Sequence, residues 1–98
     1  MVQKELTHEA DARRYVLRVN GDIASVLDYR ELGDSVAFTR AFTNPPYRGS
    51  GLAGELVEFA VDDVEANGGR RIVPSCWYVG DWFGRHPDRA GLIDPRAV

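Results

Sequence analysis

Residues 44–53, Asn-Pro-Pro-Tyr-Arg-Gly-Ser-Gly-Leu-Ala, combine residue types that can hold a phosphate group. They precede a predicted long helix, and the unpaired N–H groups and positive dipole end of a helix start form an anion site. Gly49 and Gly51 let the backbone approach a ligand that a Cβ would block. Arg48 adds a positive charge with donors suited to phosphate oxygens. The alternative is a glycine turn that only lets a strand pack tightly against a helix, and the local pattern leaves both open.

Two familiar phosphate motifs do not account for this segment. The nucleotide-hydrolysing P-loop needs a Lys, and the one Lys of the chain is Lys4. Gly49, Gly51 and Gly54 do match the G-x-G-x-x-G spacing of dinucleotide-binding proteins. That fingerprint belongs to a sheet of several parallel strands with an acidic residue after the next strand, which here ends Ile72-Val73-Pro74-Ser75. A dinucleotide is therefore not expected.

Cys76 is the candidate for covalent chemistry. It falls between a short predicted strand and a predicted helix, where the helix dipole favours the thiolate form. A thiolate beside an acyl thioester could take the acyl group and form a covalent intermediate. A lone cysteine is also commonly a small buried apolar residue, and both interpretations stay open. His86 lies ten residues further on, so along a continuous helix, at roughly 1.5 Å per residue, it is too far away for a Cys–His pair. It is instead predicted to cap the helix.

The first half of the chain predicts an antiparallel meander. Residues 13–19, 22–30 and 36–43 are predicted strands, with Asn20-Gly21 as a two-residue hairpin turn. Strict alternation in the third strand places Val36, Phe38, Arg40 and Phe42 on one face and Ala37, Thr39, Ala41 and Thr43 on the other. The opening twelve residues either add a short edge strand or fray, and His8 within them has no predicted role.

The second half changes to helical periodicity. Apolar residues recur at spacings of three and four from residue 50 to 67, which predicts an amphipathic helix. Residues 70–74 form a short strand that returns parallel to the third strand through a right-handed crossover. Residues 77–85 form a second helix, in which Trp77, Trp82 and Phe83 cover the sheet, and residues 88–98 form a surface segment. The predicted fold class is α+β: an antiparallel β-meander followed by a helix, a parallel strand and a short C-terminal helix.

Composition limits the classes of partner. A chain of 98 residues has room for one domain, residues 1–98. The formal net charge of −3 and the pI near 5.3 argue against nucleic acid and anionic membranes as partners. The sequence has no long apolar stretch and no signal-peptide core at its start, so a cytoplasmic location is expected. With one cysteine and two histidines, neither an intramolecular disulfide nor a metal site is expected.

Arg48-Gly49-Ser50-Gly51-Leu52-Ala53 resembles the (Q/R)-x-x-G-x-(G/A) pyrophosphate loop of the GNAT superfamily of N-acetyltransferases. Residues 13–93 are similar to its small single-domain subgroup, often called YjdJ-type. The similarity includes a strand followed by a cysteine, Val73-Pro74-Ser75-Cys76-Trp77-Tyr78-Val79, and the late Arg85-His86-Pro87. The three features in this order are much more specific than the loop alone.

The resemblance implies a GNAT-like domain that binds acetyl-coenzyme A and transfers the acetyl group to a small or exposed amine. Cys76 would be the acyl carrier and Tyr78 the general acid, with packing as the alternative role of Tyr78. Arg70 and Arg71 would either meet the 3′-phosphate of the coenzyme or form a solvated turn pair. Pro74 suits a strand end that separates from its neighbour to admit the cofactor. The implied cofactor-binding residues are Phe42 and Thr43 for the pantetheine arm and Arg48, Gly49, Ser50, Gly51, Leu52 and Ala53 for the pyrophosphate.

Two departures from the family pattern keep other functions open. Where subgroup members often carry His-Thr followed by Glu or an aromatic residue, this chain has Arg40, Ala41 and Phe42. The Asn20-Gly21 hairpin also replaces two helices that build the amine-substrate wall in larger relatives. The alternatives are a coenzyme A-binding module without transferase activity and a plain interaction domain whose glycine loop is structural.

Overall fold

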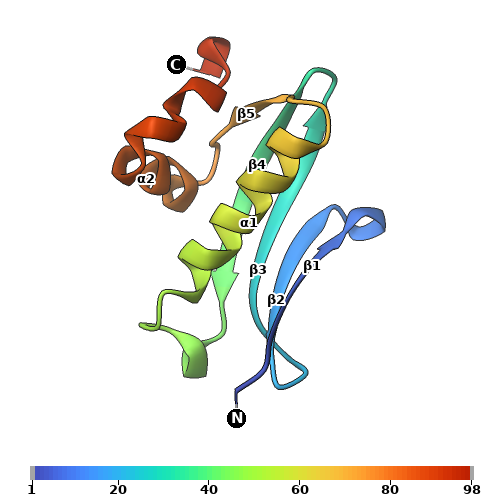
Figure 1. Cartoon of the computed structure of the whole chain (residues 1–98), viewed down its shortest axis with the longest axis vertical. Helices are drawn as coiled ribbons and strands as arrows, with labels where there is room; N and C mark the ends of the chain where they lie inside the picture. Colours follow the sequence, from blue (N-terminus) through green and yellow to red (C-terminus); the bar gives the residue numbers. More distant parts are fainter. Residues whose placement is uncertain (1, 98) are drawn as a thin grey trace.

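The computed structural model describes residues 2–97 and contains one five-stranded sheet whose strands lie in sequence order. Strands β1 (Lys4–Glu9), β2 (Arg14–Val19), β3 (Asp22–Leu32) and β4 (Ser35–Thr43) form an antiparallel meander (Figure 1). Strand β5 (Arg71–Val73) pairs with β4 in parallel. The α+β fold class predicted from the sequence, a meander followed by a helix, a parallel strand and a short helix, is confirmed.

Two helices complete the core. Helix α1 (Leu52–Ala66) lies across the sheet in Figure 1, and its apolar residues at spacings of three and four face the strands. Helix α2 (Trp77–Arg85) buries Val79, Trp82 and Phe83 in the same core. The side chains that α1 buries are Leu52, Leu56, Val57, Ala60, Val61 and Val64.

The opening residues form the edge strand β1 rather than a frayed end. His8, for which the sequence predicts no role, stacks on the ring of Tyr15 with 4.2 Å between centroids. Its Nδ1 lies 3.2 Å from Asp63 Oδ2, and its Nε2 lies 2.6 Å from the Tyr29 hydroxyl. Because Asp63 belongs to α1, His8 ties the edge strand to the helix.

Strand β4 contains a bulge. The pairing with β3 joins Asp28 to Arg40 but Tyr29 to Phe38, so Thr39 is an extra residue in β4. An extra residue on one strand shifts the alternation of every side chain that follows it. The even-numbered side chains before Thr39 therefore face one side of the sheet, and the even-numbered side chains after it face the other side.

The predicted faces of β4 are consequently wrong beyond Phe38. Val36 and Phe38 are buried in the core, as the alternation predicts, whereas Arg40 and Phe42 are exposed. Ala41 takes the core-facing position instead. A bulge depends on the pairing of two strands, which the pattern within one strand does not report.

The parallel strands β4 and β5 separate after a short pairing. Only residues 35–37 of β4 pair with residues 71–73 of β5. The next link is the N–H of Cys76, which donates to the Phe38 carbonyl at 2.9 Å. Pro74 lacks an N–H and stands where the strands begin to diverge. Among the described residues no strand pairs with this side of β4 from Thr39 to Thr43, so its edge is open beside the start of α1.

The prediction of a mere surface segment after residue 88 is wrong for its last part. Ile93 forms a parallel bridge with Ile72, and the N–H of Asp94 donates to the Ile72 carbonyl at 2.8 Å. The Asp94 residue is 3% exposed, and Arg96 donates to its carboxylate at 2.7 and 3.0 Å. Arg96 also donates to Asp34 at 2.8 Å, in the turn before β4. These contacts join residues far apart in the sequence, which local periodicity does not detect.

Asp94→Asn should lower the melting temperature at pH 7, because the Arg96 hydrogen bonds hold the pKa of Asp94 at about 2, below its usual 3.8. A carboxyl with a lowered folded-state pKa contributes stability above its unfolded pKa and loses it as pH falls through the folded value. Thermal unfolding followed by circular dichroism should therefore show the variant and the wild type converging as pH falls from about 4 toward 2. Asp88→Asn, at an exposed carboxylate, is the control and should melt like the wild type. Equal melting of Asp94→Asn and wild type at pH 7 would contradict this role.

Candidate functional site

The turn before α1 depends on two left-handed glycines. Gly49 has φ 87° and Gly51, the N-cap of α1, has φ 77°, conformations that strain any side chain with a Cβ. A Cβ on either glycine would meet no protein atom within 4 Å. The glycines therefore do not serve tight packing of a strand against the helix, as the structural alternative requires. The space above the turn is open, and Gly51 offers no side chain to cap the first helical N–H groups.

Arg48 folds back from this turn onto β4. Its Nε donates to the Thr43 carbonyl at 2.9 Å, and its guanidinium carbon lies 5.7 Å from the centre of the Phe42 ring. This is the one hydrogen bond of the Arg48 side chain with the described residues, so its terminal nitrogens keep donors for a ligand.

Three cavities follow one another around this turn. The loop cavity, of about 320 Å³, adjoins the strand cavity, also about 320 Å³, and the helix cavity of about 250 Å³ between α1 and α2. Tyr78 lines all three, and Gly51 joins the loop cavity to the helix cavity. The loop cavity is lined by Thr43, Tyr47, Arg48, Gly49, Gly51, Leu52, Ala53 and Tyr78. The strand cavity is lined by Ala41, Phe42, Thr43, Arg48, Ala53, Trp77 and Tyr78.

The residues predicted to bind the cofactor converge on these cavities, except one. The strand cavity is lined by Phe42, Thr43, Arg48 and Ala53. Of these four residues, Thr43, Arg48 and Ala53 also line the loop cavity. Gly49, Gly51 and Leu52 complete the loop cavity. Ser50 lies exposed in the turn and lines neither.

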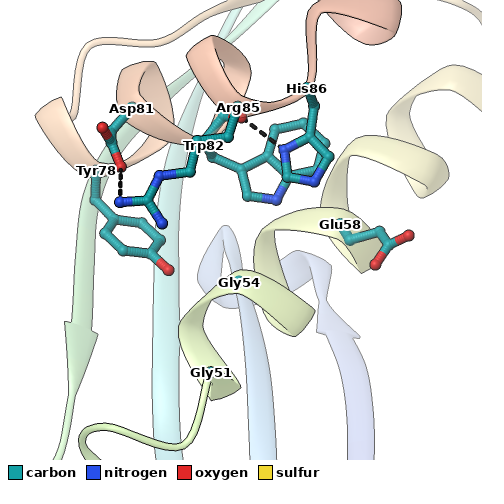
Figure 2. Close-up of a pocket in the computed structure, with 8 residues that line it drawn as sticks. All are labelled: Gly51, Gly54, Glu58, Tyr78, Asp81, Trp82, Arg85 and His86. Carbon is teal, nitrogen blue, oxygen red and sulfur yellow. Dashed lines mark hydrogen bonds and ion pairs between the residues drawn. The ribbon is translucent and has the colours of Figure 1, made fainter.

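Tyr78 lies over Gly54. Figure 2 shows its ring directed toward α1, and the hydroxyl is 3.6 Å from the position that a Cβ on Gly54 would take. Gly54, the third glycine of the G-x-G-x-x-G spacing, thus lies beneath this hydroxyl at ordinary contact distance. Burial raises the pKa of Tyr78 above 10, so the phenol keeps its proton at neutral pH.

The helix cavity also contains a histidine that sequence reasoning assigned only to capping (Figure 2). His86 Nδ1 lies 2.7 Å from the Trp82 carbonyl, and the two rings stack with 4.0 Å between centroids. This contact fits the predicted cap of the α2 C-terminus. It also directs Nε2 away from the helix end, which no sequence signal indicated. Glu58, Asp81 and Arg85 supply the charges of the cavity, and Arg85 pairs with Asp81 at 3.1 Å.

Cys76 is the N-cap of α2, immediately before Trp77 and Tyr78. Its side chain is partly buried and packs against the core, and Cys76 lines none of the three cavities. The structure thus places Cys76 at the divergence of β4 and β5 and close in sequence to Tyr78.

The prediction that Trp77 covers the sheet is wrong. Trp82 and Phe83 are buried, as predicted, but Trp77 is 79% exposed and lines the strand cavity. Only Val79, Trp82 and Phe83 share the core-facing side of α2, because helical spacing places Trp77 on another side.

Arg70 and Arg71 lie at the start of β5, beyond the C-terminal end of α1 and so away from the glycine turn. Arg70 pairs with Glu31 at 3.4 Å, and Arg71 donates to the Gly91 carbonyl. These contacts favour the prediction that Arg70 and Arg71 form a solvated turn pair. A coenzyme bound at the glycine turn would lie at the other end of α1.

Within residues 2–97, no three His, Cys, Asp or Glu residues come together as metal ligands. No helix in this part of the chain is long and apolar enough to cross a membrane. The cytoplasmic location stays a prediction.

A family model described as GCN5-related N-acetyl-transferase matches residues 14–92, and the chain belongs to this family. The solved structure of the ribosomal-protein-S18-alanine N-acetyltransferase from Escherichia coli is similar, with a TM-score of 0.62 at 19% identity. The match covers 74% of this chain and 50% of that one, so the present chain spans about half the length of that protein. At this identity the likeness shows the fold, which is GNAT-like. No curated protein matches the chain by sequence.

Proposed function

We propose that the protein is an N-acetyltransferase that binds acetyl-coenzyme A in the three cavities and transfers the acetyl group to an amine. One observation carries the proposal: the left-handed Gly49 and Gly51 and the start of α1 open onto the edge of β4 that β5 leaves free. Family membership supports the same cofactor. We also assign the chain to the small single-domain, YjdJ-type subgroup, on the sequence features around Cys76 and His86.

The cavities suit the three parts of the coenzyme. The pyrophosphate would lie in the loop cavity, on the N–H groups of residues 49–53 and the free donors of Arg48. The pantetheine arm would follow β4 through the strand cavity, and the adenosine would extend toward the helix cavity between α1 and α2. The continuity of the cavities through Tyr78 and Gly51 supports this order.

Thr43 is the better candidate of the two for backbone contact with the pantetheine arm. The Phe42 carbonyl accepts from Ser25 Oγ of β3 at 3.2 Å, so it faces the neighbouring strand. Successive carbonyls of a strand point to opposite edges, and the Thr43 carbonyl accepts from Arg48 on the other side. Phe42 would instead contribute its ring to the strand cavity.

Tyr78 is suited to protonate the leaving thiolate. In direct transfer the neutral amine attacks the acetyl carbon, the carbon–sulfur bond breaks, and the coenzyme thiolate needs a proton. Tyr78 lines all three cavities around the glycine turn and keeps its proton at neutral pH because burial raises its pKa. Its hydroxyl is therefore a candidate donor to the thiolate.

Cys76 offers a two-step route. Its thiolate would attack the acetyl carbon and release the coenzyme as thiolate, and the amine would then attack the new thioester and regenerate Cys76. Its place at the N-cap of α2, where β4 and β5 diverge, supports this route.

Two other functions make different predictions. A coenzyme A-binding module without activity is favoured by the lack of a carboxylate late in β4, where Arg40, Ala41 and Phe42 stand. An interaction domain with a structural loop predicts no cofactor binding, and the open space at Gly49 and Gly51 weighs against it.

Gly51→Glu should weaken acetyl-coenzyme A binding by about tenfold or more, because it places bulk and negative charge at the anion site. Isothermal titration calorimetry measures the dissociation constant. Gly33→Glu is the matched control: Gly33 also has a positive φ of 70° and open space around it, but it lies in the turn between β3 and β4. Equal affinities of the two variants would remove the loop from the proposed site.

Tyr78→Phe should reduce kcat roughly 100-fold while leaving the acetyl-coenzyme A dissociation constant within about twofold of wild type. Because the pKa of Tyr78 is raised above 10, Tyr78 should keep its proton up to about pH 10. The wild-type rate should therefore show no decrease from loss of this proton at lower pH. Release of coenzyme thiol, followed spectroscopically against pH, measures kcat and its pH dependence. Isothermal titration calorimetry measures the dissociation constant. A variant with wild-type kcat would assign Tyr78 to packing.

Cys76→Ser should keep cofactor binding and lose transfer if the thiol carries the acetyl group. Intact-mass spectrometry after incubation with acetyl-coenzyme A, without an amine, should detect an acetyl adduct on the wild type and none on the variant. Full transferase activity in Cys76→Ser would exclude the two-step route and leave direct transfer.

A further inference from the structure

Two arginines flank one exposed aromatic ring at the end of β4. The guanidinium carbons of Arg40 and Arg48 lie 5.3 and 5.7 Å from the centre of the Phe42 ring. Phe42 is 37% exposed, and it shares the strand cavity with Arg48 and the exposed Trp77. We call Arg40, Phe42, Arg48 and Trp77 the Arg40 patch.

The Arg40 patch is positively charged although the whole chain has a net charge of −3. The one carboxylate paired with Arg40 is Asp28, at 3.6 Å, beyond hydrogen-bond distance. The Arg40 side chain is 65% exposed, so its donors remain available. The Arg48 side chain donates only through its Nε within the described residues.

The bulge at Thr39 decides which side of the sheet Arg40 reaches. Ala41 packs against the core beneath α1, so its neighbours Arg40 and Phe42 point to the opposite face. The glycine turn leads into α1 on the other face. The Arg40 patch meets the proposed coenzyme groove at the strand cavity, which Phe42, Arg48 and Trp77 line. An acceptor held at Arg40 would therefore lie beside that groove.

We propose that the Arg40 patch binds a carboxylate of the acceptor, so that the acceptor is a peptide amine with acidic residues next to it. The inference rests on the proposed function for the identity of the acceptor, but the carboxylate site itself does not require catalysis. The exposed Arg40 guanidinium has donors that suit a carboxylate geometrically. Arg48, whose own free donors are assigned to the pyrophosphate, adds positive charge near the same Phe42 ring. A cationic acceptor such as a polyamine would be repelled there.

The test compares the peptides Ser-Glu-Glu-Gly and Ser-Gln-Gln-Gly, titrated into ¹⁵N-labelled protein saturated with coenzyme A. We expect the Glu peptide to bind about tenfold more tightly than the Gln peptide, with shifts at Arg40, Phe42 and the Trp77 indole. Arg40→Gln should abolish the difference and leave the coenzyme A dissociation constant unchanged. Arg30→Gln is the matched control: Arg30 is two residues from Asp28 on β3, so it removes the same charge from the same face.

Equal affinity of the wild type for the two peptides would overturn the proposal. It would also be overturned if Arg40→Gln and Arg30→Gln lost the preference for the Glu peptide to the same extent. Weaker coenzyme A binding in Arg40→Gln would also overturn it, because the patch would then serve a phosphate of the cofactor. If coenzyme A does not bind to the wild type at all, the proposed function fails. The same titration of unloaded protein then still decides whether Arg40 binds a carboxylate.

Discussion

The separation of β5 from β4 is the constraint on which the candidate site depends. After three residue pairs the strands part, and from Thr39 to Thr43 the edge of β4 that faces away from β3 has no neighbouring strand among the described residues. Buried backbone groups need partners. The Cys76 N–H satisfies the Phe38 carbonyl, and Arg48 satisfies that of Thr43. Between these two anchors an extended ligand can pair with the free edge, as an added strand would.

The elements that border this edge have complementary properties. On one side, the glycine turn presents helix N–H groups and Arg48, which favour an anion. On the other side, α2 directs Tyr78 toward Gly54 and leaves Trp77 exposed. The bulge at Thr39 then brings Arg40 to the opposite sheet face. One strand thus contributes to the proposed cofactor groove through its edge and to a charged surface through its side chains.

Local patterns predicted the elements, and tertiary pairing produced the differences. Helical spacing identified α2 at residues 77–85 because Val79, Trp82 and Phe83 recur on one side. The same spacing places Trp77 off that side, although its apolar character suggested burial. The bulge and the docking of Asp94 arise from pairing between distant segments, so no single stretch of sequence reports them. In the site, the glycines and Arg48 were predictable from chemistry, whereas the His86 position required the packing of α2 on α1.

The central claim is that acetyl-coenzyme A occupies the edge of β4 that β5 leaves open. The most direct test is a ¹⁵N HSQC titration of the protein with acetyl-coenzyme A. We expect the amide shifts to cluster at residues 42–54 and around Cys76 and Tyr78, with the β1–β2 hairpin unaffected. No shifts at millimolar ligand would contradict the claim and leave a GNAT-like fold that serves as an interaction domain.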